Sequence, residues 1–206
     1  MKYPKGIKPG KYFNSRKSKP DNRVKYGQRG MTLEKDLDIT NNYYLQTSRA
    51  VIHKKPTPVQ IVNVDYPSRN KAKIDEAYFK TPSTSDYNGI YKARYIDFEA
   101  KETKNKTRFP FINIHSHQVD HMKQCYEHGG VVFLIIRFSS FDETYLMPFG
   151  TFLIHWQNYL DGQRKSIAYD DIKSGSCILR QGMNPRIDYL AAVDEIFFGM
   201  ENFNER

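Results

Sequence analysis

The chain of 206 residues has no long apolar run. The longest, from Val131 to Ile136, is far shorter than the ~20 residues that cross a bilayer. It shows no charged start followed by an apolar stretch and a small-residue cleavage site, so we read no secretory signal. Its only two cysteines, Cys125 and Cys177, match no metal or redox spacing. These absences argue against a membrane protein or a disulfide-rich secreted protein, and we expect reduced thiols and a cytoplasmic location.

Acidic residues are almost missing from the first 30 positions. Ten Lys and Arg side chains stand there against one acid, Asp21, and this segment carries the whole net charge of +9. It also holds three prolines, four glycines and almost no aliphatic residues. We therefore predict that residues 1–28 are a flexible basic arm attracted to polyanions, ahead of a single domain at 29–206. The alternative is a solubilising tail.

Hydrophobic patterning in the rest of the chain predicts alternating strands and helices. Thr32 is a candidate N-cap for a helix through Leu37 and Tyr44. A continuous apolar run over 131–138 is typical of a strand buried on both faces. The other expected strands are 50–53, 59–64, 95–101 and 144–147, and the other expected helices are 117–128, 150–160 and 186–198. Strands that alternate with helices predict a mixed α/β sheet flanked by helices.

The segment 54–82 differs from its surroundings in composition. It holds four prolines and many basic residues, including the breaker Lys55-Pro56-Thr57-Pro58. A loop of this length inside a domain is uncommon unless it has a function. We expect it to be an excursion from the body of the domain.

The strongest chemical signal is Asp86 followed, thirteen residues later, by Glu99-Ala100-Lys101. In a strand, Glu99 and Lys101 share one face. Two carboxylates could hold a hard divalent cation through oxygen ligands, with the lysine beside them, and phosphodiester hydrolysis needs these parts. The alternative is an exposed edge strand with an ordinary charged face.

Residues near this motif favour a nuclease. Thr84 and Gln118 offer neutral side chains that could complete a metal site. A phosphate backbone is the natural partner of the basic side chains that surround the motif, which are Lys92, Arg94, Lys104, Lys106 and Arg108.

Other residues leave questions open. His115, His117 and His121 could form a zinc cluster, but polar contacts at a helix start or DNA-facing roles explain them as well. Asp97 shares a face with Glu99 and is a candidate third carboxylate. Cys125 is expected at a buried apolar position.

Four segments of the sequence resemble a known family. They are Arg29–Glu34, Val51–Gln60, Glu76–Lys80 and Tyr95–Thr103. They resemble RecU, a family of Holliday-junction resolvases with the PD-(D/E)xK, restriction-endonuclease-like nuclease fold. The resemblance extends over roughly residues 22–200. One departure is that Asp86 follows Ser85 where the motif of the superfamily has proline.

The resemblance implies roles by position. Asp86, Glu99 and Lys101 match the catalytic residues, and Asp86 and Glu99 with Thr84 and Gln118 match the metal site for Mg²⁺, which Mn²⁺ could replace. Residues 54–82 match a protruding stalk, and Glu34 matches an auxiliary acid on the first helix. The residues expected to bind DNA, some from the resemblance and some from charge and aromatic character, are Arg29, Arg69, Lys71, Lys73, Tyr78, Phe79, Lys104 and Lys106.

The sequence therefore predicts a metal-dependent endonuclease that resolves four-way DNA junctions in recombination and repair. The family implies a homodimer and an interaction with the RecA recombinase. Two alternatives remain: a non-enzymatic DNA-binding or architectural protein on the same fold, and a restriction-type enzyme that cuts duplex DNA.

Overall fold

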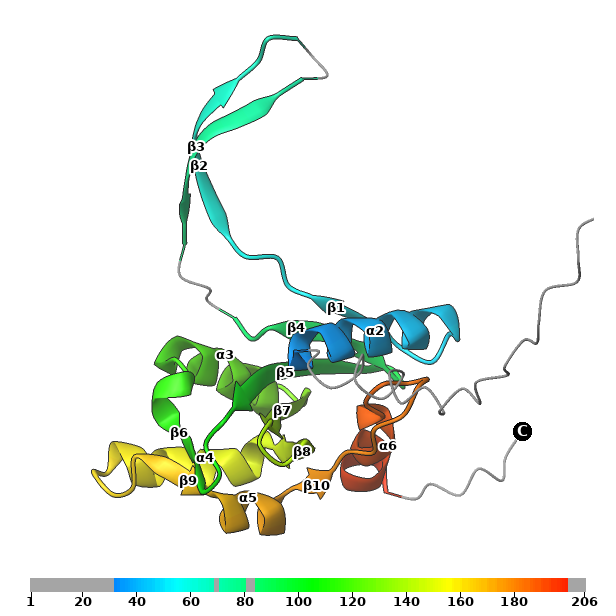
Figure 1. The fold of residues 1–206 in the computed structure, drawn as a ribbon, viewed down its shortest axis with the longest axis vertical. Coiled ribbons are helices and arrows are strands. Elements are labelled where there is room, and N and C mark those ends of the chain that lie inside the picture. The colour runs from blue at the N-terminus through cyan, green and yellow to red at the C-terminus, as the bar shows by residue number, and fades with distance from the viewer. Residues whose placement is uncertain (1–31, 69–70, 81–83, 200–206) are drawn as a thin grey trace, which may run out of the picture. The chain divides into compact units, whose positions relative to one another are not determined.

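The structure, a computed structural model, describes residues 32–68, 71–80 and 84–199 (Figure 1). A six-stranded sheet runs in the order β1-β4-β5-β7-β8-β10. β5 and β7 are parallel, and the other neighbours in this sheet are antiparallel, which confirms the predicted mixed sheet. The strands are β1 (Val51–Lys54), β4 (Tyr87–Tyr91), β5 (Arg94–Thr103), β7 (Val131–Phe138), β8 (Glu143–Pro148) and β10 (Cys177–Ile178).

The central strand β7 is buried along its whole length, as the apolar run predicts. Its side chains alternate between two cores, because neighbouring residues of a strand point to opposite faces. Val131, Phe133 and Ile135 join one core with α2 (Leu33–Gln46) and α6 (Tyr189–Val193). Val132, Leu134 and Ile136 join the other with α3 (Ser116–Glu127) and α4 (Phe149–Leu160). Helices therefore cover both faces of the sheet.

Helix α2 begins where the sequence predicts. The Oγ1 atom of its N-cap, Thr32, accepts the backbone N–H of Lys35 at 3.3 Å. The Glu102 carboxylate on β5 accepts the N–H of Leu33 at 3.0 Å, which ties the positive end of the helix to the sheet.

A buried ion cluster fixes α2 further. Asp36 is 5 % exposed, and its two oxygens lie 2.8 Å from Nη1 of Arg137 on β7 and 3.1 Å from Nη2 of Arg186. A buried carboxylate needs such partners to offset its lost hydration. The first turn of α2, which carries Glu34, is held against the sheet in this way.

The segment at 54–82 forms the stalk, a hairpin of β2 (Val59–Asp65) and β3 (Lys73–Phe79) between β1 and β4. It is a separate two-stranded sheet that extends away from the six-stranded one (Figure 1). Every residue of the two strands is exposed except Val64, which is half-buried. The sequence predicts β2 but not β3. At the foot of the hairpin, the N–H of Lys80 donates to the carbonyl of Pro58 at 3.0 Å.

The remaining elements are short, and most of them were not predicted. They are β6 (Arg108–Pro110), η1 (Phe111–Asn113), β9 (Ser166–Ala168), α5 (Tyr169–Gly175) and the π-helix η2 (Asp194–Phe198). The helix expected from residue 186 begins only at Tyr189. Among the described residues, no helix has both the length and the apolar character that a membrane span requires.

Candidate active site

The β4–β5 hairpin brings the two predicted carboxylates together. Tyr87 pairs with Phe98 in its register, so Asp86, just before β4, lies beside Glu99 on β5. The N–H of Asp86 donates to Oε2 of Glu99 at 3.0 Å. The N–H of Ala100 donates to Oδ2 of Asp86 at 3.4 Å. Positions thirteen apart in the sequence thus become direct neighbours.

Two further predicted residues contact Glu99, which is fully buried. Nζ of Lys101, two residues along the same strand, lies 2.5 Å from its Oε1. Nε2 of Gln118 donates to the same oxygen at 2.8 Å. Oε1 of Gln118 in turn accepts the N–H of His115 at the start of α3 at 3.1 Å. The amide of Gln118 therefore orients the carboxylate through the helix start.

The electrostatics of this group favour a cation. Burial raises the pKa of Glu99 well above its usual range, and the neighbouring Asp86 carboxylate raises it further, while Lys101 opposes both effects. Two neighbouring carboxylates repel each other unless positive charge lies between them. Glu99 is buried and Asp86 is half-buried, and their oxygens, with a single lysine beside them, fit a hard divalent ion such as Mg²⁺.

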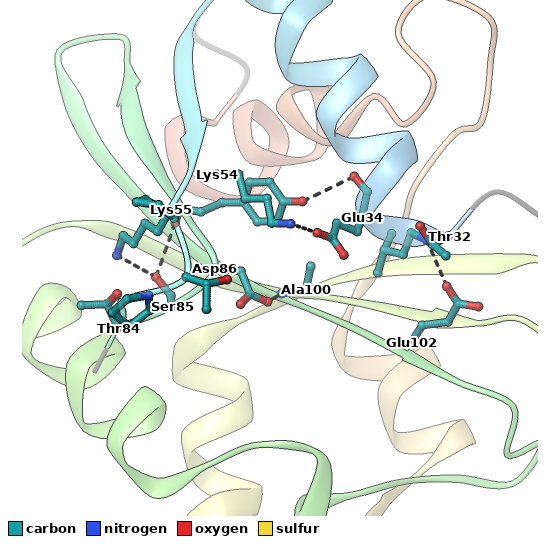
Figure 2. Close-up of a pocket in the computed structure, with 14 residues that line it drawn as sticks. Thr32, Glu34, Lys54, Lys55, Thr84, Ser85, Asp86, Ala100 and Glu102 are labelled. Atoms are coloured by element: carbon teal, nitrogen blue, oxygen red, sulfur yellow. Dashed lines mark hydrogen bonds and ion pairs between the residues drawn. The ribbon is translucent and has the colours of Figure 1, made fainter. Parts of the chain in front are cut away.

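A pocket of about 660 Å³ opens beside Asp86 (Figure 2). Thr84 and Asp86 line one part of it, and Glu34 on α2 lines another. Glu34 forms an ion pair with Lys54. Glu99 and Lys101 are not among the lining residues, so Asp86 is the group shared by the pocket and the carboxylate pair.

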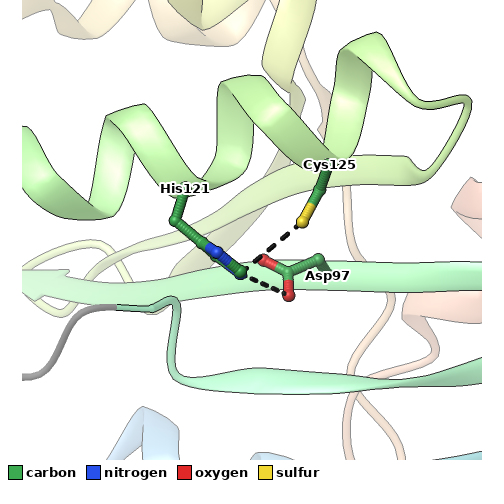
Figure 3. Close-up of side chains that lie close together, drawn as sticks. All are labelled: Asp97, His121 and Cys125. Atoms are coloured by element: carbon green, nitrogen blue, oxygen red, sulfur yellow. Dashed lines mark hydrogen bonds and ion pairs between the residues drawn. The ribbon is translucent and has the colours of Figure 1, made fainter.

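Asp97, the candidate third carboxylate, belongs to a different cluster. It is fully buried and contacts Lys55, Ser85, Tyr95 and His121. Figure 3 shows Asp97 on β5 facing His121 and Cys125 on α3.

The three histidines do not converge. The rings of His115 and His117 stack on each other, with centroids 5.3 Å apart. His121 turns instead to Asp97, and Cys125 is half-buried beside it. The expected buried apolar setting of Cys125 is therefore only partly right, since polar groups lie next to its thiol.

The residues expected to bind DNA are spread over the surface. On the stalk, Phe79 is 83 % exposed and Tyr78 is 61 % exposed. The other described members, also exposed, are Lys71, Lys73, Lys104 and Lys106. Arg29 and Arg69, like the basic arm at 1–28, lie outside the described residues.

Lys55 lies close to the site but was not singled out from the sequence as a site residue. Nζ of Lys55 lies 3.0 Å from Oδ2 of Asp97 and 3.2 Å from Oγ of Ser85, and the backbone N–H of Lys55 donates to the carbonyl of Asp86 at 2.8 Å. Lys55 belongs to a Lys-Lys-Pro breaker that marks the stalk foot, and nothing in that pattern indicates its contact with β5.

The family model of RecU, "Recombination protein U", matches residues 28–195. A "Holliday junction resolvase RecU" of Staphylococcus epidermidis is 56% identical over 200 residues, which are 95% of this chain and 96% of the relative. A protein of the same name from Staphylococcus aureus is 54% identical over 199 residues, again 95% of this chain and 96% of the relative. Among solved structures, that of Hjc, a Holliday junction resolvase from Archaeoglobus fulgidus, matches with a TM-score of 0.39 and 11% identity, over 69% of this chain and 90% of that one.

Proposed function

The chain belongs to the RecU family, and from this membership we propose that it is a Holliday junction resolvase, an endonuclease that hydrolyses phosphodiester bonds in four-way DNA junctions. The observation that carries the chemistry is the contact of Asp86 with Glu99, with Lys101 on the same strand. An architectural DNA-binding protein has no need of this combination.

Each group has a separate task in the proposal. Asp86 and Glu99 hold a divalent ion, Mg²⁺ or in its place Mn²⁺, and Thr84 and Gln118 support them. When bound, the ion supplies Lewis-acid polarisation of the scissile phosphate. Lys101 places its ammonium where negative charge develops on the phosphate. Gln118 keeps Glu99 in one orientation through its 2.8 Å hydrogen bond, and Glu34 is an auxiliary acid across the pocket.

Binding of DNA is assigned to other parts of the chain. Lys and Arg side chains neutralise the phosphates of DNA. These contacts do not depend on the base sequence. We assign this role to Arg29, Lys104 and Lys106, and the reading of the junction centre to Arg69, Lys71, Lys73, Tyr78 and Phe79 of the stalk. A homodimer, an interaction with the RecA recombinase and a cytoplasmic location are parts of the same proposal.

Cleavage of a four-way junction should be compared with cleavage of linear duplex, each with and without Mg²⁺. We expect paired nicks in the junction with Mg²⁺ and binding alone without it. Binding with no cleavage under any condition favours the architectural alternative. Equal cleavage of duplex and junction favours a restriction-type enzyme and contradicts the proposal.

A further inference from the structure

A second cluster of metal-ligating side chains lies next to the carboxylate pair, on the same strand but with different chemistry. Asp97 on β5 and His121 and Cys125 on α3 each offer one ligand atom, and these atoms all lie within 4.8 Å of one another (Figure 3). His121 and Cys125 are four residues apart, so they share one face of the helix. This trio shares only His121 with the histidine trio that the sequence suggested.

Two of the three distances between ligand atoms, both measured from the imidazole nitrogen of His121, match those around a tetrahedral zinc ion, and the third is within 4.8 Å. Bond lengths of about 2.0–2.2 Å to nitrogen and oxygen and about 2.3 Å to sulfur place the nitrogen about 3.3 Å from the oxygen and about 3.5 Å from the sulfur. In the structure, Nε2 of His121 lies 3.2 Å from Oδ2 of Asp97 and 3.5 Å from Sγ of Cys125.

Hydrogen bonding to the His121 ring serves only one of the groups gathered around it. Three polar groups approach the same imidazole nitrogen, because Nζ of Lys55 also lies 3.4 Å from Nε2 of His121. That nitrogen has either one hydrogen or one lone pair, so it can serve one of the three at a time. A coordinated ion would satisfy the carboxylate, the imidazole and the thiolate together.

The surroundings are those of a supported ligand set. The Asp97 carboxylate also accepts hydrogen bonds from Ser85 and, at 2.9 Å, from the hydroxyl of Tyr95. Such outer contacts orient a ligating carboxylate. An open pocket lined by His121, Cys125, Gln124 and His128 gives an ion a path from solvent.

From these contacts we propose that Asp97, His121 and Cys125 form a second metal site, for a borderline-soft divalent ion of the Zn²⁺ type, separate from the Asp86–Glu99 pair. Thiolate and imidazole ligands select such ions, whereas the oxygen ligands of the first site suit Mg²⁺.

Lys55 competes with the ion for the carboxylate of Asp97. Without metal its ammonium balances the charge of buried Asp97 at 3.0 Å. With metal, the two charges of the ion balance Asp97 and the Cys125 thiolate, the thiol proton leaves, and Lys55 is no longer needed there. The cluster stays neutral in both states, and metal binding releases the side chain of Lys55 from Asp97 and Ser85.

The test uses the full-length protein, stripped of metal by a chelator and kept reduced without thiols. Co²⁺ is the probe, because a thiolate ligand gives it a charge-transfer absorption band that oxygen ligands do not. We expect the band to appear on titration with Co²⁺, to persist in excess Mg²⁺ and to disappear when Zn²⁺ is added. Cys125→Ser should remove the band, and Cys177→Ser, which changes the only other cysteine, should keep it.

Two further variants retain all three ligands and guard against misfolding of Cys125→Ser. Tyr95→Phe removes an outer hydrogen bond and should weaken Co²⁺ binding by about 10- to 100-fold. Lys55→Met removes the competitor and should strengthen it. The proposal is overturned if the parent protein shows no thiolate band, if the band depends on Cys177, or if neither variant changes the affinity for Co²⁺.

Discussion

Glu99 is held from three sides at once, by the backbone of Asp86, the ammonium of Lys101 and the amide of Gln118. These partners come from the start of β4, from β5 itself and from α3. The position of this carboxylate, through both of its oxygens, therefore depends on three elements. We assign DNA binding to other, exposed basic residues, so mutations should separate cleavage from binding.

Asp86→Ala or Glu99→Ala is expected to abolish nicking of a four-way junction. Each change removes a proposed oxygen ligand of the ion, and a lost stabilisation of several kcal/mol would lower the rate by at least about a hundredfold. Lys101→Ala should have a similar effect. Junction binding should persist in gel-shift assays. Asp120→Asn, at an exposed carboxylate on α3, is the matched control and should cut normally. Near-normal nicking by either alanine variant would refute the metal assignment.

Asp36→Ala tests the ion cluster beneath α2. The change leaves Arg137, which is 4 % exposed, and Arg186 without their shared carboxylate. Removal of one partner from a buried ion pair costs about 3–5 kcal/mol, and we expect a loss of this size in urea unfolding. Lys35→Ala, on the exposed part of the same helix, should be nearly neutral. Equal unfolding midpoints for the two variants would contradict this expectation.

At the scale of elements, sequence patterns predict those parts whose own side chains meet a core. In the helix that begins after Thr32, apolar residues recur on the buried face. The continuous apolar run 131–138 matches a strand that is buried on both faces. Both elements are found where expected. Strand β3 has no such pattern, because its residues are all exposed and only pairing with β2 defines it.

Tertiary contacts explain the misplaced start of α6. Arg186 bonds to Asp36, and the N–H of Ile187 donates to Oγ1 of Thr40 at 3.0 Å. Residues before Tyr189 are therefore held by α2 and do not join the helix α6.

Contacts between distant segments also limit how much of the site can be predicted from the sequence. Asp86, Glu99 and Lys101 lie within one hairpin and could be predicted, but the contact of Lys55 with Asp97 depends on how the chain returns from the stalk.

The stalk can be tested as a unit. Replacing residues 59–79 by a short Gly-Ser turn should preserve folding, because Pro58 and Lys80 are already hydrogen-bonded neighbours. Cleavage should lose its preference for junctions over duplex, since the exposed basic and aromatic side chains of the stalk are gone. Arg69→Ala should lose part of that preference. Relative rates on the two substrates measure it, and an unchanged ratio in the folded variant would show that the stalk does not discriminate.

At the scale of the whole molecule, we expect the basic arm at 1–28 to set the response of DNA binding to salt. Deletion of residues 1–28 should weaken DNA binding and flatten its dependence on salt. Each phosphate contact contributes roughly −0.9 to the log–log slope, so the loss of several contacts should change the slope by several units. Binding titrations across salt concentrations measure this. An unchanged slope would identify the arm as a solubilising tail.

The proposed homodimer predicts coupled cleavage. A symmetric dimer presents two identical sites to a junction that is itself nearly twofold, so the two nicks should fall in strands of like polarity. Sedimentation at the working concentration should give the mass of two chains. A protein that sediments as a monomer while it fully resolves junctions would exclude this arrangement.

The closed foot of the stalk has a consequence for the order of folding. β1 pairs with β4 across the whole insertion, with Lys54 opposite Tyr87. The entropy lost in closing a flexible loop grows with the logarithm of its length. Once β2 and β3 have paired, the ends at Pro58 and Lys80 are already together, and only a short span remains to be closed. Early formation of the hairpin therefore lowers the entropic barrier to the docking of β1, and the length of the stalk can change without a matching change in that barrier.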